Sequence, residues 1–189
     1  MSDTSTQFDH LIKAAGPAAL VIREHLIPAE GADAVFFPAT YADIGYNIDW
    51  ENQRDRTGRN VCLIDSVGSQ ANRIEPMFKE ERYSALVPQI VIKVGNKEVN
   101  LLDVGHRAGD AIARCSELKD DLNAAFQAIL QNNNAMPLAK IAPTSIVFGV
   151  WDSRDTQAKL PRLIASTVRA YDVRKLTRSA TYIAPVDYV

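Results

Sequence analysis

Apolar and polar positions along the chain follow changing periodicities that predict a succession of short strands and helices. The apolar run Val61 to Ile64 is typical of a short buried strand. From Ser66 to about Phe78 the apolar side chains recur at helical spacing, and either Asp65 or Ser66 can cap the start of that helix. Pro76 lacks a backbone N–H, so the helix should kink or end near it. The pattern therefore predicts a strand followed directly by a helix.

A hairpin, a long helix and a further strand are predicted after the first helix. Two β-rich runs, Val87 to Val94 and Lys97 to Leu102, flank Gly95-Asn96 and predict a hairpin. His106 to about Leu130 gives the clearest helical periodicity, and the β-rich run Ser145 to Trp151 predicts a further strand. The order is therefore β-α-β-β-α-β, which is the α+β, ferredoxin-like (RRM-like) arrangement. This fold hosts many activities, so the order by itself indicates no function.

A third helix is predicted from about Ala158 to Tyr171, with Pro161 in its first turn. Arg162, Ser166 and Arg169 follow i, i+4, i+7 spacing and would line up along about 10 Å of that helix. A row of donors of this kind can follow the backbone of a polyanion, although a solubilising surface would carry the same residues.

The predicted domain organisation follows from these elements. Residues 1–60 are expected to form an N-terminal arm with strands and a loop packed on the core, and the polar stretch Asp49 to Asn60 is predicted to be that loop. Residues 61–151 form the ferredoxin-like core, and residues 152–189 add the basic helix and a strand to the same domain.

Composition and charge narrow the class of protein. The chain is 47% apolar and 23% charged, has no apolar run long enough to cross a bilayer, and lacks the features of a signal peptide at its start. Cys62 and Cys115 have no metal-ligand spacing and are predicted to be buried free thiols, so we expect a cytoplasmic protein. The net charge is only −2, but Trp151 to Ala180 carries seven Lys or Arg against three Asp, and a polyanion responds to such local concentration of charge.

The predicted helix after Ser66 presents polar side chains away from its apolar stripe, at Ser69, Gln70, Asn72 and Arg73. These residue types contact phosphate and sugar in nucleic-acid complexes. A solvated helix face is the simpler interpretation of the same residues when they are taken alone.

Several long motifs in a fixed order favour the nucleic-acid interpretation over a solvated helix face. They are Phe37-Pro38-Ala39-Thr40-Tyr41-Ala42, Ile64-Asp65-Ser66-Val67-Gly68-Ser69-Gln70-Ala71-Asn72-Arg73-Ile74-Glu75, His106-Arg107-Ala108-Gly109-Asp110-Ala111, Trp151-Asp152-Ser153-Arg154, Gln157-Ala158-Lys159-Leu160-Pro161-Arg162, Arg169-Ala170-Tyr171-Asp172-Val173 and Leu176-Thr177-Arg178-Ser179-Ala180. Together they resemble the backbone subunit of type I-G (formerly I-U) CRISPR surveillance complexes, a member of the RAMP superfamily. The family often has Gly where Asp155 stands.

The resemblance implies a ferredoxin-like palm, several copies of which line up along one CRISPR guide RNA (crRNA) in a Cascade-like antiviral ribonucleoprotein. Each copy would grip the sugar-phosphate backbone without base specificity, and the guide would pair with target DNA. Other copies of the chain and other subunits of the complex would be its partners, with no cofactor, metal, membrane or catalytic activity. The candidate RNA-binding residues are Ser66, Ser69, Gln70, Asn72, Arg73, His106, Arg107, Arg154, Lys159, Arg162, Arg169, Arg174 and Arg178.

Within that set, His106 and Asp110 have the spacing of an ordinary helix-start pair, and Arg107 is the better candidate for a phosphate contact. Trp151 and Tyr171 could stack on bases, but core packing is the favoured interpretation for both. Two alternatives stay open. One is a RAMP-type endoribonuclease with Asp65, Asp152 and His106 as suspects, and the other is a structural subunit that never touches RNA.

Overall fold

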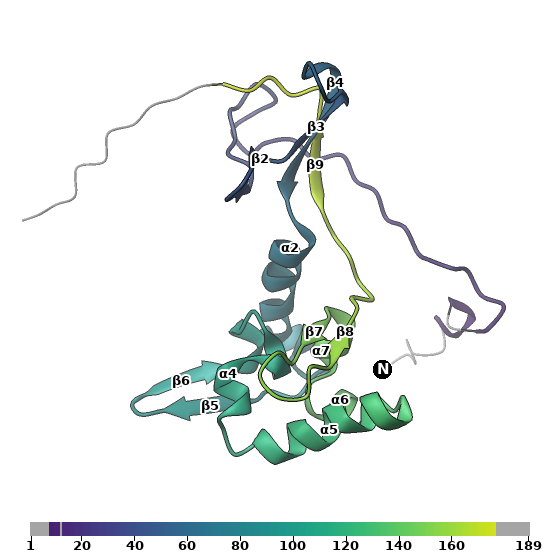
Figure 1. Ribbon diagram of the computed structural model, residues 1–189, viewed down its shortest axis with the longest axis vertical. Helices are drawn as coiled ribbons and strands as arrows, with labels where there is room; N and C mark the ends of the chain where they lie inside the picture. The colour runs from purple at the N-terminus through teal and green to yellow at the C-terminus, as the bar shows by residue number, and fades with distance from the viewer. Residues whose placement is uncertain (1–7, 12, 177–189) are drawn as a thin grey trace, which may run out of the picture. The chain divides into compact units, whose positions relative to one another are not determined.

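The computed structural model describes residues 8–11 and 13–176 (Figure 1). The chain divides into two compact units, Met1–Phe36 and Phe37–Val189. The described part of the first unit forms one 3-10 turn, η1 (Asp9–Leu11), and otherwise only turns and irregular chain. Within the N-terminal arm predicted with strands, residues 18–26 form no strand, and their large apolar side chains are exposed.

The second unit mixes short strands with short helices. Its strands are β1 (Thr40–Tyr41), β2 (Gly45–Tyr46), β3 (Ile48–Asn52), β4 (Thr57–Asp65), β5 (Val91–Val94), β6 (Lys97–Asn100), β7 (Val150–Trp151), β8 (Lys159–Leu160) and β9 (Val168–Tyr171). Its helices are α2 (Val67–Ile74), α3 (Glu81–Ser84), α4 (Ala111–Arg114), α5 (Lys119–Asn132), α6 (Met136–Ile141) and α7 (Pro143–Val147), with 3-10 turns η2 (Glu75–Lys79), η3 (Leu101–Asp103) and η4 (Arg107–Gly109). This mixture confirms the α+β class predicted from the sequence.

The strands pair antiparallel in small sheets with the orders β1-β2, β3-β4-β9, β5-β6 and β7-β8. The predicted strand at Val61 to Ile64 is confirmed within β4, and the hairpin around Gly95-Asn96 is confirmed as β5 and β6. The succession β4, α2, β5, β6, α5, β7 keeps the predicted order, while its strands belong to three different sheets. Because β9 pairs with β4, the C-terminal part of the described chain completes the same unit as the middle part.

Helix α2 begins and ends where the sequence indicates. The Ser66 hydroxyl accepts the backbone N–H of Ser69 at 3.2 Å, which satisfies one of the free donors of the first turn. At Glu75 the chain tightens into η2, with Pro76 near its start, because proline cannot continue the α-helical hydrogen bonds. Figure 1 shows α2 leading from the three-stranded sheet to the helical part of the unit.

The hydrophobic core lies among the helices α4 to α7 and the strands β5 and β7. Leu122 and Phe126 of α5 are fully buried, as predicted for the apolar stripe of this segment. The buried cluster comprises Ile92, Leu101, Ala108, Ala113, Leu122, Ala125, Phe126, Leu138, Ala142, Val150 and Ala158. Each fully buried Leu or Phe contributes roughly 1.5–3 kcal/mol, so this cluster holds the helical part together.

The single helix predicted from His106 to about Leu130 is wrong in its first half. Arg107 has a left-handed φ of 53°, and the Asp110 side chain then accepts the N–H of Ile112 and begins the short helix α4. That helix ends at Arg114, so Cys115 points to solvent and its predicted burial is wrong, whereas Cys62 on β4 is buried as predicted.

Two further predictions on the C-terminal side are wrong. Pro143 begins a helix, α7, where Ser145 to Trp151 was predicted to be a strand, and only Val150–Trp151 is extended. The predicted third helix from Ala158 to Tyr171 does not form. That stretch contains β8, an irregular segment and β9, whose alternating burial fits an edge strand on β4.

The polar stretch Asp49 to Asn60, predicted to be a loop, is a hairpin instead. Strands β3 and β4 pair from Ile48 with Cys62 to Asn52 with Thr57, and residues 53–56 form the turn between them. Their pairing places residues 37–60 with the second unit rather than in an N-terminal arm.

Candidate nucleic-acid interface

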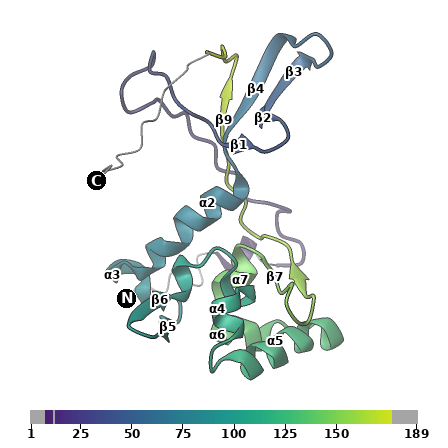
Figure 2. The ribbon, with the colours of Figure 1, turned by 60° about the vertical axis from the view of Figure 1, so that its left-hand side comes forward.

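The first turn of α2 meets a segment that lies far away in the sequence. The chain between β8 and β9 returns from the helical part of the unit to the three-stranded sheet (Figure 2). On its way, the Ser166 hydroxyl donates to Oε1 of Gln70 at 3.2 Å, across a sequence separation of 96 residues. Arg162 approaches the same turn, because a Cβ added at Gly68 would lie 3.7 Å from a guanidinium nitrogen of Arg162. The first turn of α2, with Gln70, thus shares one surface with Arg162 and Ser166.

A carboxylate at the end of β4 organises the polar side chains of this turn. Gln70 Nε2 donates to Asp65 Oδ2 at 2.6 Å, and Arg73 Nε lies 3.2 Å from the same oxygen. Partial burial raises the pKa of Asp65, but hydrogen bonds from Ser69 and Gln70, together with the Arg73 charge, hold that pKa below its ordinary value. The carboxylate therefore stays ionised and fixes the side chains around it.

Arg73 keeps most of its guanidinium available despite that ion pair. Its contacts to Asp65 and to the Ser69 hydroxyl both engage Nε, and 73% of its side chain is exposed. The N-terminus of α2 carries the positive end of the helix dipole, and Gly68 allows a ligand to approach its backbone closely. Arg162 adds a full positive charge beside this turn. The arrangement suits an anionic group such as a phosphate.

Arg107 does not meet the expectation that it presents its charge to phosphate. It is buried, with Nε 2.7 Å from Glu75 Oε2, and its guanidinium donates to the carbonyl of Gly149 and to Oδ1 of Asn72. Burial lowers the pKa of Arg107 and raises that of Glu75, while the charge of each partner opposes these changes. Arg107 therefore anchors η4 and the end of α2 from inside, and Asn72 takes part in that anchor.

His106 is the exposed neighbour of this anchor. Its Nδ1 lies 3.2 Å from Asp110 Oδ2, which confirms the predicted helix-start pair, and 83% of its side chain is exposed. Its contact with RNA stays a prediction.

The basic residues of the C-terminal segment are exposed but do not form one row. Because the predicted helix is absent, Arg162 lies in irregular chain while Arg169 lies on β9, at the three-stranded sheet. Arg154 lies in the turn between β7 and β8, Lys159 begins β8, and Arg174 follows β9. Arg178 lies outside the described residues. Of these residues, Arg162 lies beside the first turn of α2, Lys159 lies beside Trp151, and Arg169 and Arg174 lie at or just after β9.

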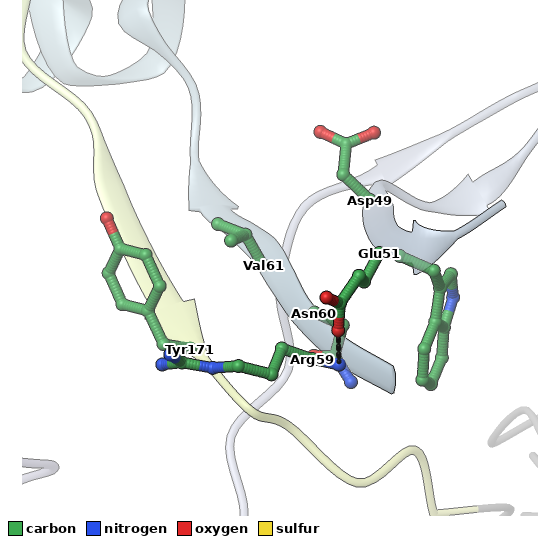
Figure 3. A pocket seen from close by; sticks show the side chains of 7 residues that line it. Asp49, Glu51, Arg59, Asn60, Val61 and Tyr171 are labelled. Atoms are coloured by element: carbon green, nitrogen blue, oxygen red, sulfur yellow. Dashed lines mark hydrogen bonds between the residues drawn. The ribbon is translucent and has the colours of Figure 1, made fainter. Parts of the chain in front are cut away.

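Two exposed aromatic residues contradict the expectation of core packing. Trp151 and Tyr171 are both more than half exposed. Tyr171 lines an open pocket on the three-stranded sheet, together with Asp49, Trp50, Glu51, Arg59, Asn60 and Val61. Figure 3 shows the Arg59 side chain extending toward Tyr171, and the Arg59 guanidinium pairs with Asp172 at 3.2 Å. The carboxylates of Asp49 and Glu51 line this pocket, and the charge of Arg59 is offset by Asp172, so the pocket does not suit phosphate.

The residues suspected of catalysis in the alternative interpretation are held in structural contacts. Asp152 is fully buried with Oδ1 3.2 Å from Arg114 Nε, and Asp65 is engaged as described above. Within residues 8–11 and 13–176 no group of three or more His, Cys, Asp or Glu side chains is placed to hold a metal ion. The same part of the chain contains no helix long and apolar enough to cross a membrane.

A comparison with protein families identifies the family of the chain. A family model described as CRISPR-associated protein GSU0053 matches residues 20–175, which include α2, the turn around Arg154 and the segment that carries Arg162. No curated protein and no solved structure matches the chain. Since the family model covers most of the 189 residues, the chain belongs to the CRISPR-associated GSU0053 family and has a role in CRISPR defence.

Proposed function

We propose that this chain is the guide-RNA-binding backbone subunit of a type I-G CRISPR surveillance complex in the cytoplasm. It holds the sugar-phosphate backbone of the guide without reading base identity, and several copies act together with other subunits of the complex. The guide that they display pairs with target DNA. Family membership supports the CRISPR context of this proposal, and the surface at the start of α2 supports RNA binding.

The observation that carries the proposal is the meeting of Arg162 and Ser166 with the first turn of α2. A helix N-terminus, a guanidinium and several hydroxyl and amide groups on one surface provide donors for phosphate and for ribose 2′-hydroxyl groups. None of these groups requires a particular base. A guide contains a variable spacer, so a subunit that coats it needs this type of recognition.

The salt dependence of RNA binding tests the proposal. Fluorescence anisotropy with labelled single-stranded RNAs of several sequences would give Kd at several salt concentrations for the wild type, Arg162→Gln and Lys140→Gln. Lys140 is an exposed cation on α6, so its variant carries the same charge change away from the proposed surface. Arg162→Gln is expected to weaken binding to all the sequences alike and to lower the salt slope by about one phosphate contact, roughly 0.7–1. Equal affinities and slopes in the two variants would contradict the role of this surface.

We propose that the subunit itself is not catalytic. The burial of Asp152 against Arg114 and the hydrogen bonds around Asp65 leave these carboxylates poorly suited to act as an acid or base. A labelled guide RNA incubated with the protein and Mg²⁺ should stay intact. Specific cleavage that is lost in Asp65→Asn would favour the endoribonuclease alternative instead.

Co-expression with a CRISPR repeat-spacer transcript separates these functions from a purely structural one. An RNA of defined length is expected to co-purify with the chain and to raise its ratio of absorbance at 260 nm to that at 280 nm. Purification of nucleic-acid-free protein from such cells would favour a structural subunit.

A further inference from the structure

Trp151 is held at the surface by a rigid backbone. It ends strand β7, pairs with Lys159 of β8, and is 55% exposed. The next residue, Asp152, is fully buried beside Arg114, and its backbone N–H donates to Ala158. On the other side Gly109 packs so closely that an added Cβ would lie 2.6 Å from the carbonyl oxygen of Trp151. The indole is thus presented to solvent from a fixed position.

A lysine lies beside this indole. The Lys159 ammonium lies 5.8 Å from the centroid of the Trp151 ring, and exposed Arg154 follows in the turn between β7 and β8. The neighbouring acid, Asp155, lies 2.7 Å from Arg114, a guanidinium that it shares with the buried Asp152. An exposed aromatic ring with a lysine ammonium beside it favours a ligand that has both flat apolar faces and negative charge, and a nucleotide has both.

Tyr171, another strongly exposed aromatic residue of the unit, has the opposite surroundings. The pocket at Tyr171 carries Asp49 and Glu51, and its Arg59 is paired with Asp172 (Figure 3). Negative charge there disfavours a phosphate, so the two aromatic sites are not equivalent.

We propose that Trp151 stacks on a nucleobase of bound single-stranded RNA, with Lys159 and Arg154 contacting the flanking phosphates. The inference rests on the proposed RNA-binding function and adds a contact to the bases themselves. Because every base has a π-face, stacking on Trp151 tolerates any sequence and agrees with a guide of variable spacer. It would hold one base in a defined place while the surface at α2 holds the backbone.

A pair of oligonucleotides tests the stacking directly. Kd is measured by anisotropy for the full chain with a labelled oligouridine and with the same oligonucleotide made abasic. Loss of one stacked base corresponds to roughly 5- to 150-fold in affinity. Trp151→Leu is expected to weaken binding to oligouridine by a factor in this range and to leave binding to the abasic strand unchanged, whereas Trp151→Phe retains most of the affinity for oligouridine.

Phe37→Leu is the matched control, because Phe37 is also exposed and the residues that follow it, 38–44, contain no Lys or Arg. It should bind oligouridine like the wild type, and urea midpoints of all the variants should agree, since Trp151 and Phe37 are exposed. In a Trp50→Phe background, binding of oligouridine should also quench the remaining indole fluorescence.

The outcomes separate the two proposals. If Trp151→Leu binds oligouridine as well as the wild type does while Arg162→Gln binds it more weakly, stacking is overturned and the proposed function stands. An equal loss in Trp151→Leu for the oligouridine and for the abasic strand also overturns stacking. Failure of the wild type to bind any RNA overturns the proposed function, and the stacking falls with it.

Discussion

Asp152→Asn should destabilise the second unit more than any comparable change nearby. The Asp152 carboxylate is fully buried, with one oxygen 3.2 Å from Arg114 Nε and the other accepting the N–H and hydroxyl of Thr156. An amide keeps one acceptor for Thr156, but it removes the charge and turns an NH₂ group toward Arg114, which has only donors. The guanidinium of Arg114, itself buried, then loses its buried partner.

The expected magnitude follows from this burial. Removing one member of a buried ion pair costs about 3–5 kcal/mol, and the lower end, about 3 kcal/mol, applies here because Asp155 stays 2.7 Å from Arg114. With a urea dependence of about 2 kcal/mol per molar, the unfolding midpoint should fall by about 1.5 M. Urea titrations followed by tryptophan fluorescence measure this midpoint.

Asp155→Asn provides the matched control, because it removes one negative charge from the other carboxylate that pairs with Arg114. The Asp155 side chain is 46% exposed, so water compensates for much of the loss and the expected cost is at most about 1 kcal/mol. Equal midpoint shifts in the two variants, or a shift below about 0.5 M for Asp152→Asn, would refute the assignment of stability to the buried pair.

Three further changes test other parts of the structure. Ser66→Ala should lower the free energy of unfolding by about 1 kcal/mol, because the cap of α2 is lost, and Ser66→Asp should restore it in the same urea titration. Gly149→Ala should lower the free energy of unfolding by about 1–2 kcal/mol, since Gly149 has φ +80° and the new Cβ would lie 2.9 Å from Arg162 Cγ. The anisotropy assay should also show a lower RNA affinity for this variant, because Arg162 is displaced. The lowered pKa of Asp65 means that its contribution to stability is present above its ordinary pKa of about 3.9 and is lost as pH falls through the lowered value. The difference in urea midpoint between the wild type and Asp65→Asn should therefore be larger near about pH 6 than near about pH 3, and a difference independent of pH would contradict the role of the charge.

Local signals explain which elements could be predicted from the sequence. The turn at Gly95-Asn96, the cap at Ser66 and the interruption at Pro76 each depend on a few neighbouring residues, and the structure confirms all three. Around Ala158 to Tyr171 the apolar spacing fitted a helix equally well, and only the pairing of β9 with β4, far away in the sequence, decides for a strand.

The candidate site was predictable only where its residues follow a local pattern. The polar face of α2 follows from its periodicity, so Ser69 and Arg73 were found correctly on its surface. Arg107 could not be distinguished from a surface arginine, because its partner Glu75 belongs to another element and no local pattern links them. The exposure of Trp151 likewise depends on strand β8 and on the buried Asp152 beside it.

The pairing of β4 with β9 has a consequence for the order in which the surface at α2 is assembled. Asn60 bonds to Val173 across 113 positions of sequence, and closing so long a loop is slow compared with forming α2. During synthesis, α2 emerges from the ribosome well before Arg162 and Ser166, which complete the surface at its first turn. The surface proposed to bind RNA is therefore complete only after the segment that carries Arg162 and Ser166 has been synthesised and has folded back onto α2.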